Sequence, residues 1–309
     1  FVKLFISEIV HTEDSFLLKL YYKFNFATEP YFTYLLLQKS RGIEMNRLVC
    51  QMILILLIPI ISFIFIIPNF LFEIISAFWI DKKTLINIFS FLPFNERSVS
   101  LTAGIIITII LLIFFRRINK DKFFNIGNKY GKYPLFIYFL ASKVFGFGCV
   151  NLVRIPIYLQ FHLVIKEFFE CIEVDKNTEV VDEKIKLQSM NMNENTEEIN
   201  LILEDTYEIT NKQIPVNKQR QPTIRISNGN EFTGVRTFNQ KFVEEVRKQT
   251  NNYSKKFNYI NIFATTNSKH NKTIIESSFK NAGRTGFKNL VVFQYNSTKG
   301  YFDEAYTIF

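Results

Sequence analysis

The sequence predicts an α-helical membrane protein that carries a small soluble α/β domain at its C-terminus. Residues 48–67, LVCQMILILLIPIISFIFII, contain no charged side chain. A helix rises about 1.5 Å per residue, so about 20 apolar residues cross a bilayer core of roughly 30 Å. Residues 211–309 instead alternate short apolar runs with polar turns, and they hold sixteen Lys and Arg against six Asp and Glu. These observations define the two parts of the predicted fold.

The first part is predicted to begin with amphipathic helices over residues 1–45 and to continue as a membrane domain over residues 46–169. Its first span is 48–67, and its second is 99–115, which two arginines close. The loop after the second span is strongly basic, and the positive-inside rule places such a loop on the inner side of the membrane. The first span therefore runs outward and the second span returns.

A third span over residues 134–153 is ambiguous. Lys143 lies in its middle, and Arg154 and Pro156 interrupt the apolar run directly after it. A span that is followed by an amphipathic surface helix fits this pattern. A hairpin that dips into the membrane fits it equally well, so both alternatives stay open.

Four ionisable residues of the apolar half are candidates for chemistry: Glu73, Lys143, Arg154 and His162. An ionisable side chain in hydrocarbon is costly, so each is a functional hypothesis, as in the proton relays of pumps. We prefer a plainer interpretation, in which Glu73 and Arg154 lie at the interface and Lys143 extends its ammonium group to the head groups. Partner subunits that neutralise these charges fit the same interpretation.

Residues 170–210 are predicted to be an acidic linker. From residue 171 they hold eleven Asp and Glu against three Lys, and stretches such as SMNMNENTEE are polar throughout. Low hydrophobicity combined with high charge is typical of a mobile tether. This tether would join the membrane domain to the basic domain.

The basic domain, residues 211–309, has the periodicity of a βαβ-like module. The expected elements are a hairpin over 223–238 with an Asn-Gly turn, a helix over 239–249, a strand over 257–266, a helix over 272–281, a strand over 290–295 and a last helix over 299–309. Its basic surface candidates are Arg247, Lys248, Lys255, Lys256, Arg284 and Lys288. They suit acidic lipid head groups, nucleic acid or acidic partner subunits, and we prefer a solvated face beside a membrane.

No catalytic or metal-binding motif is present. The sequence has no phosphate-binding loop, no dinucleotide fingerprint and no H-E-x-x-H, and its three His are scattered. Cys50, Cys149 and Cys171 are far apart in sequence and are expected to be free thiols. We therefore expect no cofactor, no bound metal and no enzyme activity of the chain's own.

Two resemblances bear on function. The excess of Phe, Ile, Asn, Lys and Tyr over Gly and Pro resembles, in composition only, mitochondrially encoded inner-membrane complex subunits of AT-rich protist genomes. The stretch YINIFATTNSKHNKTII, followed by GFKNLVVF, resembles small-subunit ribosomal protein eleven over about 40 residues. The Gly-rich and Arg-rich end of that family is missing here.

The resemblance in composition implies a structural, non-catalytic subunit of a respiratory-chain or ATP-synthase complex. The expected place is the mitochondrial inner membrane, with several spans and the basic domain on the matrix side. The expected partners are other membrane-complex subunits and lipids. The first alternative is a mitochondrial ribosomal protein whose basic domain binds rRNA, and the second is an ion- or proton-translocating subunit that uses Glu73, Lys143 or Arg154.

Overall fold

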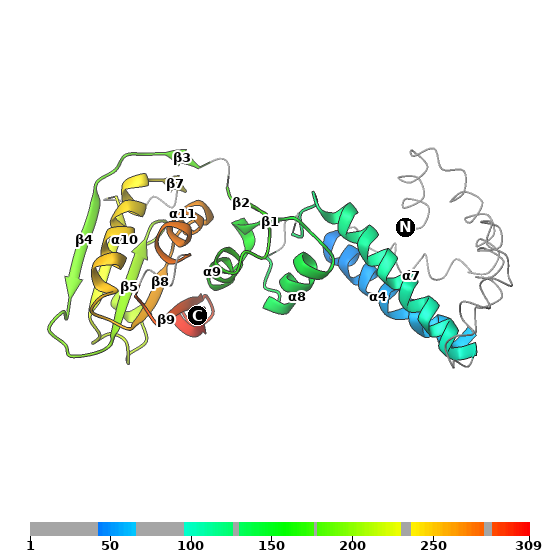
Figure 1. The fold of residues 1–309 in the computed structure, drawn as a ribbon. Helices are drawn as coiled ribbons and strands as arrows, with labels where there is room; N and C mark the ends of the chain where they lie inside the picture. The colour runs from blue at the N-terminus through cyan, green and yellow to red at the C-terminus, as the bar shows by residue number, and fades with distance from the viewer. Residues whose placement is uncertain (1–42, 66–95, 126–129, 176–177, 230–235, 281–285) are drawn as a thin grey trace. The chain divides into compact units, whose positions relative to one another are not determined.

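A computed structural model describes residues 43–65, 96–125, 130–175, 178–229, 236–280 and 286–309 (Figure 1). The described residues from Leu48 onward are assigned to one unit of the chain. The amphipathic helices expected over residues 1–45 lie almost wholly outside the described residues, and so do Glu73 and Arg284. The remaining predictions can be compared with the structure.

Two long helices occupy the first apolar segments. Helix α4 is Ile43–Phe65 and helix α7 is Glu96–Asn119. The side chains of Gln51 and Asn119 exchange two hydrogen bonds, of 2.9 and 3.4 Å, where the helices meet. A Cβ atom added at Gly104 would lie 2.6 Å from the Ser62 hydroxyl, so the absence of a side chain there permits the close approach.

The membrane spans are the main correction to the predicted fold class. Within the part of the chain that the structure describes, no helix has the length and apolar character needed to cross a bilayer. Helices α4 and α7 cover most of the first two regions predicted as spans, but a run of apolar residues cannot by itself distinguish a lipid-facing helix from one packed on another helix. The observed fold is mixed α/β with a large sheet.

The third predicted span, 134–153, is not a single helix. It consists of α8 (Leu135–Phe139), a π-helical turn (Leu140–Val144) and strand β1 (Cys149–Asn151). The helical segment ends just before Gly146, whose φ of +75° disfavours residues with a side chain. A Cβ at this glycine would also lie 2.7 Å from the Arg116 backbone, so the tight turn explains why the helix ends here.

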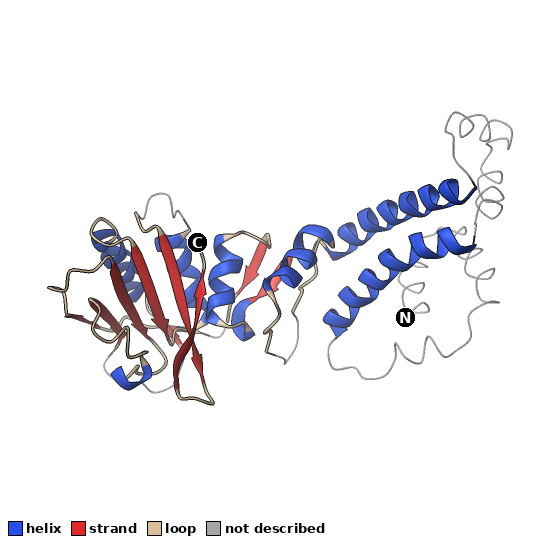
Figure 2. Cartoon of the chain, turned by 90° about the horizontal axis from the view of Figure 1, so that it is seen from below, coloured by secondary structure: helices blue, strands red, loops and turns tan. Residues whose placement is uncertain are grey.

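Residues 185–307 contain a six-stranded sheet (Figures 1 and 2). Its strand order is β10-β9-β8-β5-β6-β4. The bounds are β4 Ile185–Met190, β5 Glu198–Glu204, β6 Thr223–Asn228, β8 Tyr259–Ala264, β9 Asn289–Asn296 and β10 Tyr301–Thr307. The four inner strands are parallel, and the two edge strands, β4 and β10, are antiparallel to their neighbours.

The connections reverse direction at the middle of the sheet. From β5 the chain moves to β6 on one side, and it then crosses to β8 on the other side of β5. Helices α10 (Gln240–Tyr253), α11 (Ser268–Ile274) and α9 (Ile157–Ile165) lie against one face of the sheet (Figure 2). A π-helical turn, Ile275–Phe279, extends α11. The β5–β8 boundary is thus the topological switch point, where ligands of open α/β sheets bind.

The other face of the sheet is only partly covered. The segment between β5 and β6 folds over it, with a short 3-10 turn at Asn211–Gln213. A cluster of buried apolar side chains joins this segment to the strands: Ile202, Ile209, Ile214, Phe263, Phe293 and Phe302. The part of the face above β4 and β6 stays open, and it holds the candidate site.

Several local predictions are confirmed and others are wrong. The helix at α10 and the strands at β8 and β9 lie where they were expected. The predicted acidic linker instead contributes β2 (Cys171–Glu173), β3 (Glu179–Val180), β4 and β5. The run INLIL within β5 is apolar, but the acidic residues around it dominate the average composition.

The hairpin expected over 223–238 does not form, because β7 (Thr237–Phe238) pairs with β3 rather than with β6. The last predicted helix is the edge strand β10, which pairs with β9 across a register shift. The partner of β7 is distant in the chain, whereas β10 pairs as a hairpin with β9, the strand directly before it. The predicted helix 272–281 begins four residues earlier, at Ser268, and continues as the π-helical turn.

Candidate functional site

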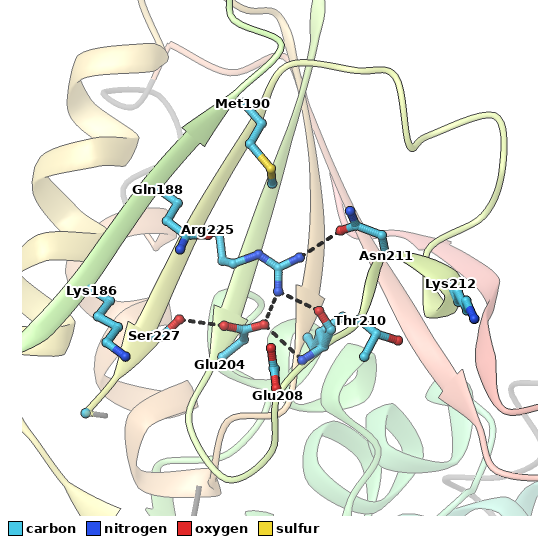
Figure 3. Close-up of a pocket in the computed structure, with 12 residues that line it drawn as sticks. Lys186, Gln188, Met190, Glu204, Glu208, Thr210, Asn211, Lys212, Arg225 and Ser227 are labelled. Atoms are coloured by element: carbon cyan, nitrogen blue, oxygen red, sulfur yellow. Dashed lines mark hydrogen bonds and ion pairs between the residues drawn. The ribbon is translucent and has the colours of Figure 1, made fainter. Parts of the chain in front are cut away.

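A cavity of about 630 Å³ lies over the open part of the sheet (Figure 3). The strand register places its side chains on one face, with Lys186 opposite Ser227 and Gln188 opposite Arg225 across β4 and β6. Glu204 is paired with Ser227 across β5 and β6. The walls are completed by the segment that follows β5, because Glu208 to Lys212 also line the cavity.

The floor of the cavity is a buried ion pair between Glu204 and Arg225. Their side chains are 2% and 10% exposed. The Arg225 guanidinium also donates to the carbonyl oxygen of Ile209, at 2.5 Å, and to Oδ1 of Asn211, at 3.0 Å. One strand residue therefore binds both the neighbouring strand and the covering segment, as Figure 3 shows.

Further hydrogen bonds to the Glu204 carboxylate hold the same segment. One oxygen accepts a hydrogen bond from the backbone N–H of Ile209, at 2.9 Å, and the other accepts from the Ser227 hydroxyl, at 2.5 Å. The negative charge of Glu204 is thus fully partnered and does not repel an anion in the cavity. The pair also fixes the position of the wall over β5.

The rim of the cavity provides cations, neutral hydrogen-bonding groups and one exposed carboxylate, that of Glu208. Lys186 and Lys212 are exposed on opposite sides of Arg225 (Figure 3), and Gln188 and Thr210 are exposed between them. Exposed ammonium groups bind phosphate as point charges, and amides and hydroxyls can read polar edges of a ligand. Met190 adds an apolar surface. The arrangement suits an anionic ligand that also has polar and flat parts.

A second polar cluster closes the topological switch point itself. The Asp205 carboxylate accepts hydrogen bonds from Nδ2 of Asn228, at 2.8 Å, and from the backbone N–H and Nδ2 of Asn267, at 3.0 and 2.8 Å. Its oxygen Oδ2 also lies 2.7 Å from Nδ1 of His270. Asp205 and His270 are 8% and 0% exposed, so this cluster is interior.

The His270 ring links this cluster to the start of α10. Its Nε2 accepts a hydrogen bond from the backbone N–H of Asn239, at 2.8 Å, so the ring proton belongs on Nδ1 and points to Asp205. The ring also stacks on Phe238, with centroids 5.0 Å apart. Protein groups therefore fill the switch-point crevice, and the open cavity lies beside it.

The chain was compared with known proteins. A family model for the SMODS- and Ubiquitin system-associated 2TM effector domain matches residues 37–309. The chain belongs to this effector-domain family. No curated protein matches it.

Solved structures give a partial likeness. One is the SAVED/CARF-domain containing receptor Cap4 of Acinetobacter baumannii with the cyclic trinucleotide 2'3'3'-cAAA, at 9% identity and a TM-score of 0.41, covering 56% of this chain and 41% of that chain. Another is the same receptor with 3'3'3'-cAAA, at 9% identity and a TM-score of 0.43, covering 69% and 56%. The chain thus spans about half the length of these receptors.

Membership in the effector-domain family corrects the functional predictions. The resemblance to mitochondrially encoded complex subunits is wrong, and so are the expected role in a respiratory-chain or ATP-synthase complex, the ribosomal and proton-translocating alternatives, and the mitochondrial inner-membrane location. An AT-biased composition reflects codon usage, which many unrelated proteins share. Of the expected partners, other membrane-complex subunits have no support from the family match.

The structure separates the ionisable residues that the sequence grouped in the apolar half. Lys143 is exposed, and its ammonium group donates to the carbonyl oxygen of Glu167 at 3.0 Å. Arg154 is exposed in a 3-10 turn, Leu152–Arg154, that ends before α9 begins. His162 is buried within α9, which begins at Ile157, so it lies on a different element from Arg154. None of the three lines the cavity.

The basic surface candidates lie away from the cavity. Arg247 and Lys248 are exposed on α10, Lys255 and Lys256 are exposed after it, and Lys288 is exposed before β9. Their role in binding lipid, protein or nucleic acid stays a prediction. Among the residues that the structure describes, no cluster of three or more His, Cys, Asp or Glu could hold a metal ion.

The sequence reasoning missed every residue at the centre of the site. Glu204 and Asp205 follow the apolar run INLIL directly, and a carboxylate pair at the end of a buried strand is a signal that could have been read. Assigning this stretch to a linker removed it from consideration. Arg225 and Lys186 become informative only when the pairing of β5, β6 and β4 is known.

Burial makes His162 a source of acid sensitivity. Desolvation, and then the charge of Lys166, lower the pKa of His162 from 6.5 to about 4. As the pH falls from about 6.5 toward 4, the unfolded chain therefore binds a proton that the folded chain does not, and the free energy of unfolding decreases. His162→Leu is expected to weaken this decrease, as measured by urea unfolding at pH 7 and pH 5. Equal losses in the variant and the unmodified chain would contradict it.

Proposed function

We propose that this effector domain binds an anionic oligonucleotide ligand in the cavity over β4, β5 and β6. The observation that carries the proposal is an open cavity on the sheet face, beside the switch point, whose rim offers two exposed lysines while the Glu204–Arg225 pair in its floor is neutral as a whole.

The size of the cavity suits a ligand of several ring systems. Its volume of about 630 Å³ lies within the roughly 300–1,000 Å³ that small-molecule sites occupy. A cavity of this size takes more than an inorganic phosphate. The cavity is also open to solvent at its rim, where Lys186 and Lys212 are exposed, so a ligand can enter without rearrangement of the sheet.

The chemistry of the walls matches the parts of a nucleotide. Lys186 and Lys212 are placed to bind phosphate groups, and Gln188, Asn211 and Thr210 offer amide and hydroxyl groups to base edges. Arg225 is committed to Glu204, to Ile209 and to Asn211. A phosphate that competes for Arg225 would therefore loosen the segment after β5, which gives ligand binding a physical route to the covering wall.

Removing the two rim charges is expected to weaken binding. Titration calorimetry of the full chain would use a panel of a cyclic trinucleotide, a cyclic dinucleotide, AMP and inorganic phosphate. Each lost phosphate contact of about 1.4 kcal/mol corresponds to a tenfold change in Kd. We expect Lys186→Ala combined with Lys212→Ala to raise the Kd of the tightest ligand tenfold or more.

A matched control is Lys248→Ala, which removes the same charge from the exposed side of α10. It should leave the Kd within about twofold, because exposed charges far from a site are screened by salt. An unchanged Kd in the double variant would place the ligand elsewhere. No binding of any member of the panel by the unmodified chain would contradict the proposed function.

A further inference from the structure

Two of the three cysteines are brought together by a short parallel strand pair. In the register of β1 and β2, Cys149 lies opposite Cys171. Neighbouring strands are about 4.8 Å apart, and disulfides join Cα atoms that are about 4.4–6.8 Å apart. Register partners project to the same side of a sheet, and the two thiols lie near enough for each to affect the other's electrostatics. Both are free in the structure.

Backbone hydrogen bonds hold both cysteines in this arrangement. The N–H of Cys149 donates to the carbonyl oxygen of Lys122 at 3.2 Å, and its own carbonyl oxygen accepts from Phe124 at 2.9 Å. The N–H of Cys171 donates to the carbonyl oxygen of Gly148 at 3.0 Å. The two Cα atoms are therefore fixed at a distance that a disulfide can span without a rearrangement of the chain.

The strand pair lies at a junction of the fold. On one side Cys149 forms a parallel bridge with Phe123, just after α7. On the other side the carbonyl oxygen of Ile172, next to Cys171, accepts a hydrogen bond from the Lys272 ammonium group of α11, at 3.1 Å. A covalent link between β1 and β2 would thus tie the chain that leaves α7 to the α/β sheet domain.

We propose that Cys149 and Cys171 form a reversible disulfide that locks β1 to β2 under oxidation by a peroxide. The exposed Cys171 thiolate attacks hydrogen peroxide, its sulfur is oxidised to a sulfenic acid, and hydroxide leaves and takes a proton to become water. The Cys149 sulfur then attacks the sulfenic sulfur and gives up its proton, the S–S bond forms, and a second water leaves. Two thiols thus pass two electrons to one peroxide, and a thiol reductant restores them.

The solvent exposure of the two cysteines and the protonation of the Cys149 thiol give the two residues different roles. Cys171 is exposed, whereas Cys149 is half-buried. Burial, and then the hydrogen bond with Cys171, raise the pKa of the Cys149 thiol to about 12. Because the thiolate is the nucleophile, closure of the disulfide should accelerate about tenfold for each pH unit between 7 and 9.

The test uses the full chain with hydrogen peroxide as the probe and no nucleotide. The chain is oxidised, denatured and alkylated with N-ethylmaleimide, and the alkylated cysteines are counted by mass spectrometry. The expected result is three labelled cysteines before oxidation and one, Cys50, after it, with full recovery under dithiothreitol. Peptide mapping should show residue 149 linked to residue 171 within one chain.

Single variants locate the bond. Cys149→Ser and Cys171→Ser should each abolish it, and Cys50→Ser, the control, should retain it. The unmodified chain by itself is decisive even where a variant fails to fold. Oxidation that leaves Cys149 open to alkylation, or that cross-links two chains instead, would overturn the proposal. Either result leaves the nucleotide proposal untouched, since no ligand is present.

Discussion

Arg225→Met is expected to lower the free energy of unfolding by about 3 kcal/mol or more, because it leaves the Glu204 carboxylate buried without its cation. The two side chains are 10% and 2% exposed, so solvent cannot replace the lost partner. The substitution also removes the hydrogen bonds to Ile209 and Asn211 that hold the covering segment. Urea unfolding of the full chain, followed by circular dichroism, measures the loss.

A double variant separates the charge from the packing. Combining Glu204→Gln with Arg225→Met should be less damaging than Arg225→Met alone, because no buried charge then stays unpaired. A matched control is Lys241→Met, which breaks the exposed pair of Lys241 with Asp182, whose side chains are 59% and 73% exposed. Exposed pairs contribute little. An unfolding midpoint of Arg225→Met equal to that of the unmodified chain would contradict the account.

Asp205→Ala is expected to cost about 3 kcal/mol of stability, because it leaves several buried donors without an acceptor. The donors belong to Asn228, Asn267 and His270, and the Asp205 side chain is interior. Asp205→Asn keeps the shape and one acceptor oxygen, so its loss should be smaller. The same urea experiment compares the two variants.

Hydrogen exchange gives the Asp205 prediction a local readout. The backbone N–H of Asn267 donates to Asp205 and should exchange faster in Asp205→Ala, under conditions where strand β9 stays protected. The amide of Thr250, which lies within α10, is a control whose exchange should change little. If Asp205→Ala and Asp205→Asn were equally stable, the cluster would not depend on the oxygen that accepts these bonds.

The elements that could be predicted are those whose signals are local. Helix α10 follows Asn239, whose side chain accepts a hydrogen bond from the backbone N–H of Lys241, and Asn is a favoured N-cap residue. Strands β8 and β9 are apolar runs bounded by polar residues. These features act within one segment, so the sequence pattern alone was sufficient to predict the three elements.

The elements that were missed depend on partners outside their own segment. Strand β5 lies at the centre of the sheet, and the acidic surroundings that suggested a linker are balanced by Arg225, which is 21 residues from Glu204. Strand β10 forms because β9 offers it an edge, although its own sequence also fitted a helix. Composition averaged over forty residues cannot detect either partner.

The candidate site was missed for the same reason. Lys186, Arg225 and Lys212 come from three separate segments, and only the order of β4, β6 and β5 brings them to one cavity. The ionisable residues that the sequence did single out, such as Lys143 and Arg154, are exposed and separate. A charged residue within an apolar stretch was therefore a weaker guide to the position of the candidate site than a pair of carboxylates at the end of a buried strand.

The most direct test of the account is hydrogen–deuterium exchange of the full chain with and without a saturating cyclic trinucleotide. The account predicts slower exchange in β4 and in residues 204–212, which line the cavity, and little change at the exposed end of α10 around Lys248. The Lys186→Ala, Lys212→Ala double variant should lose this protection. Protection confined to the α10 side of the sheet, or no protection with any ligand of the panel, would contradict it.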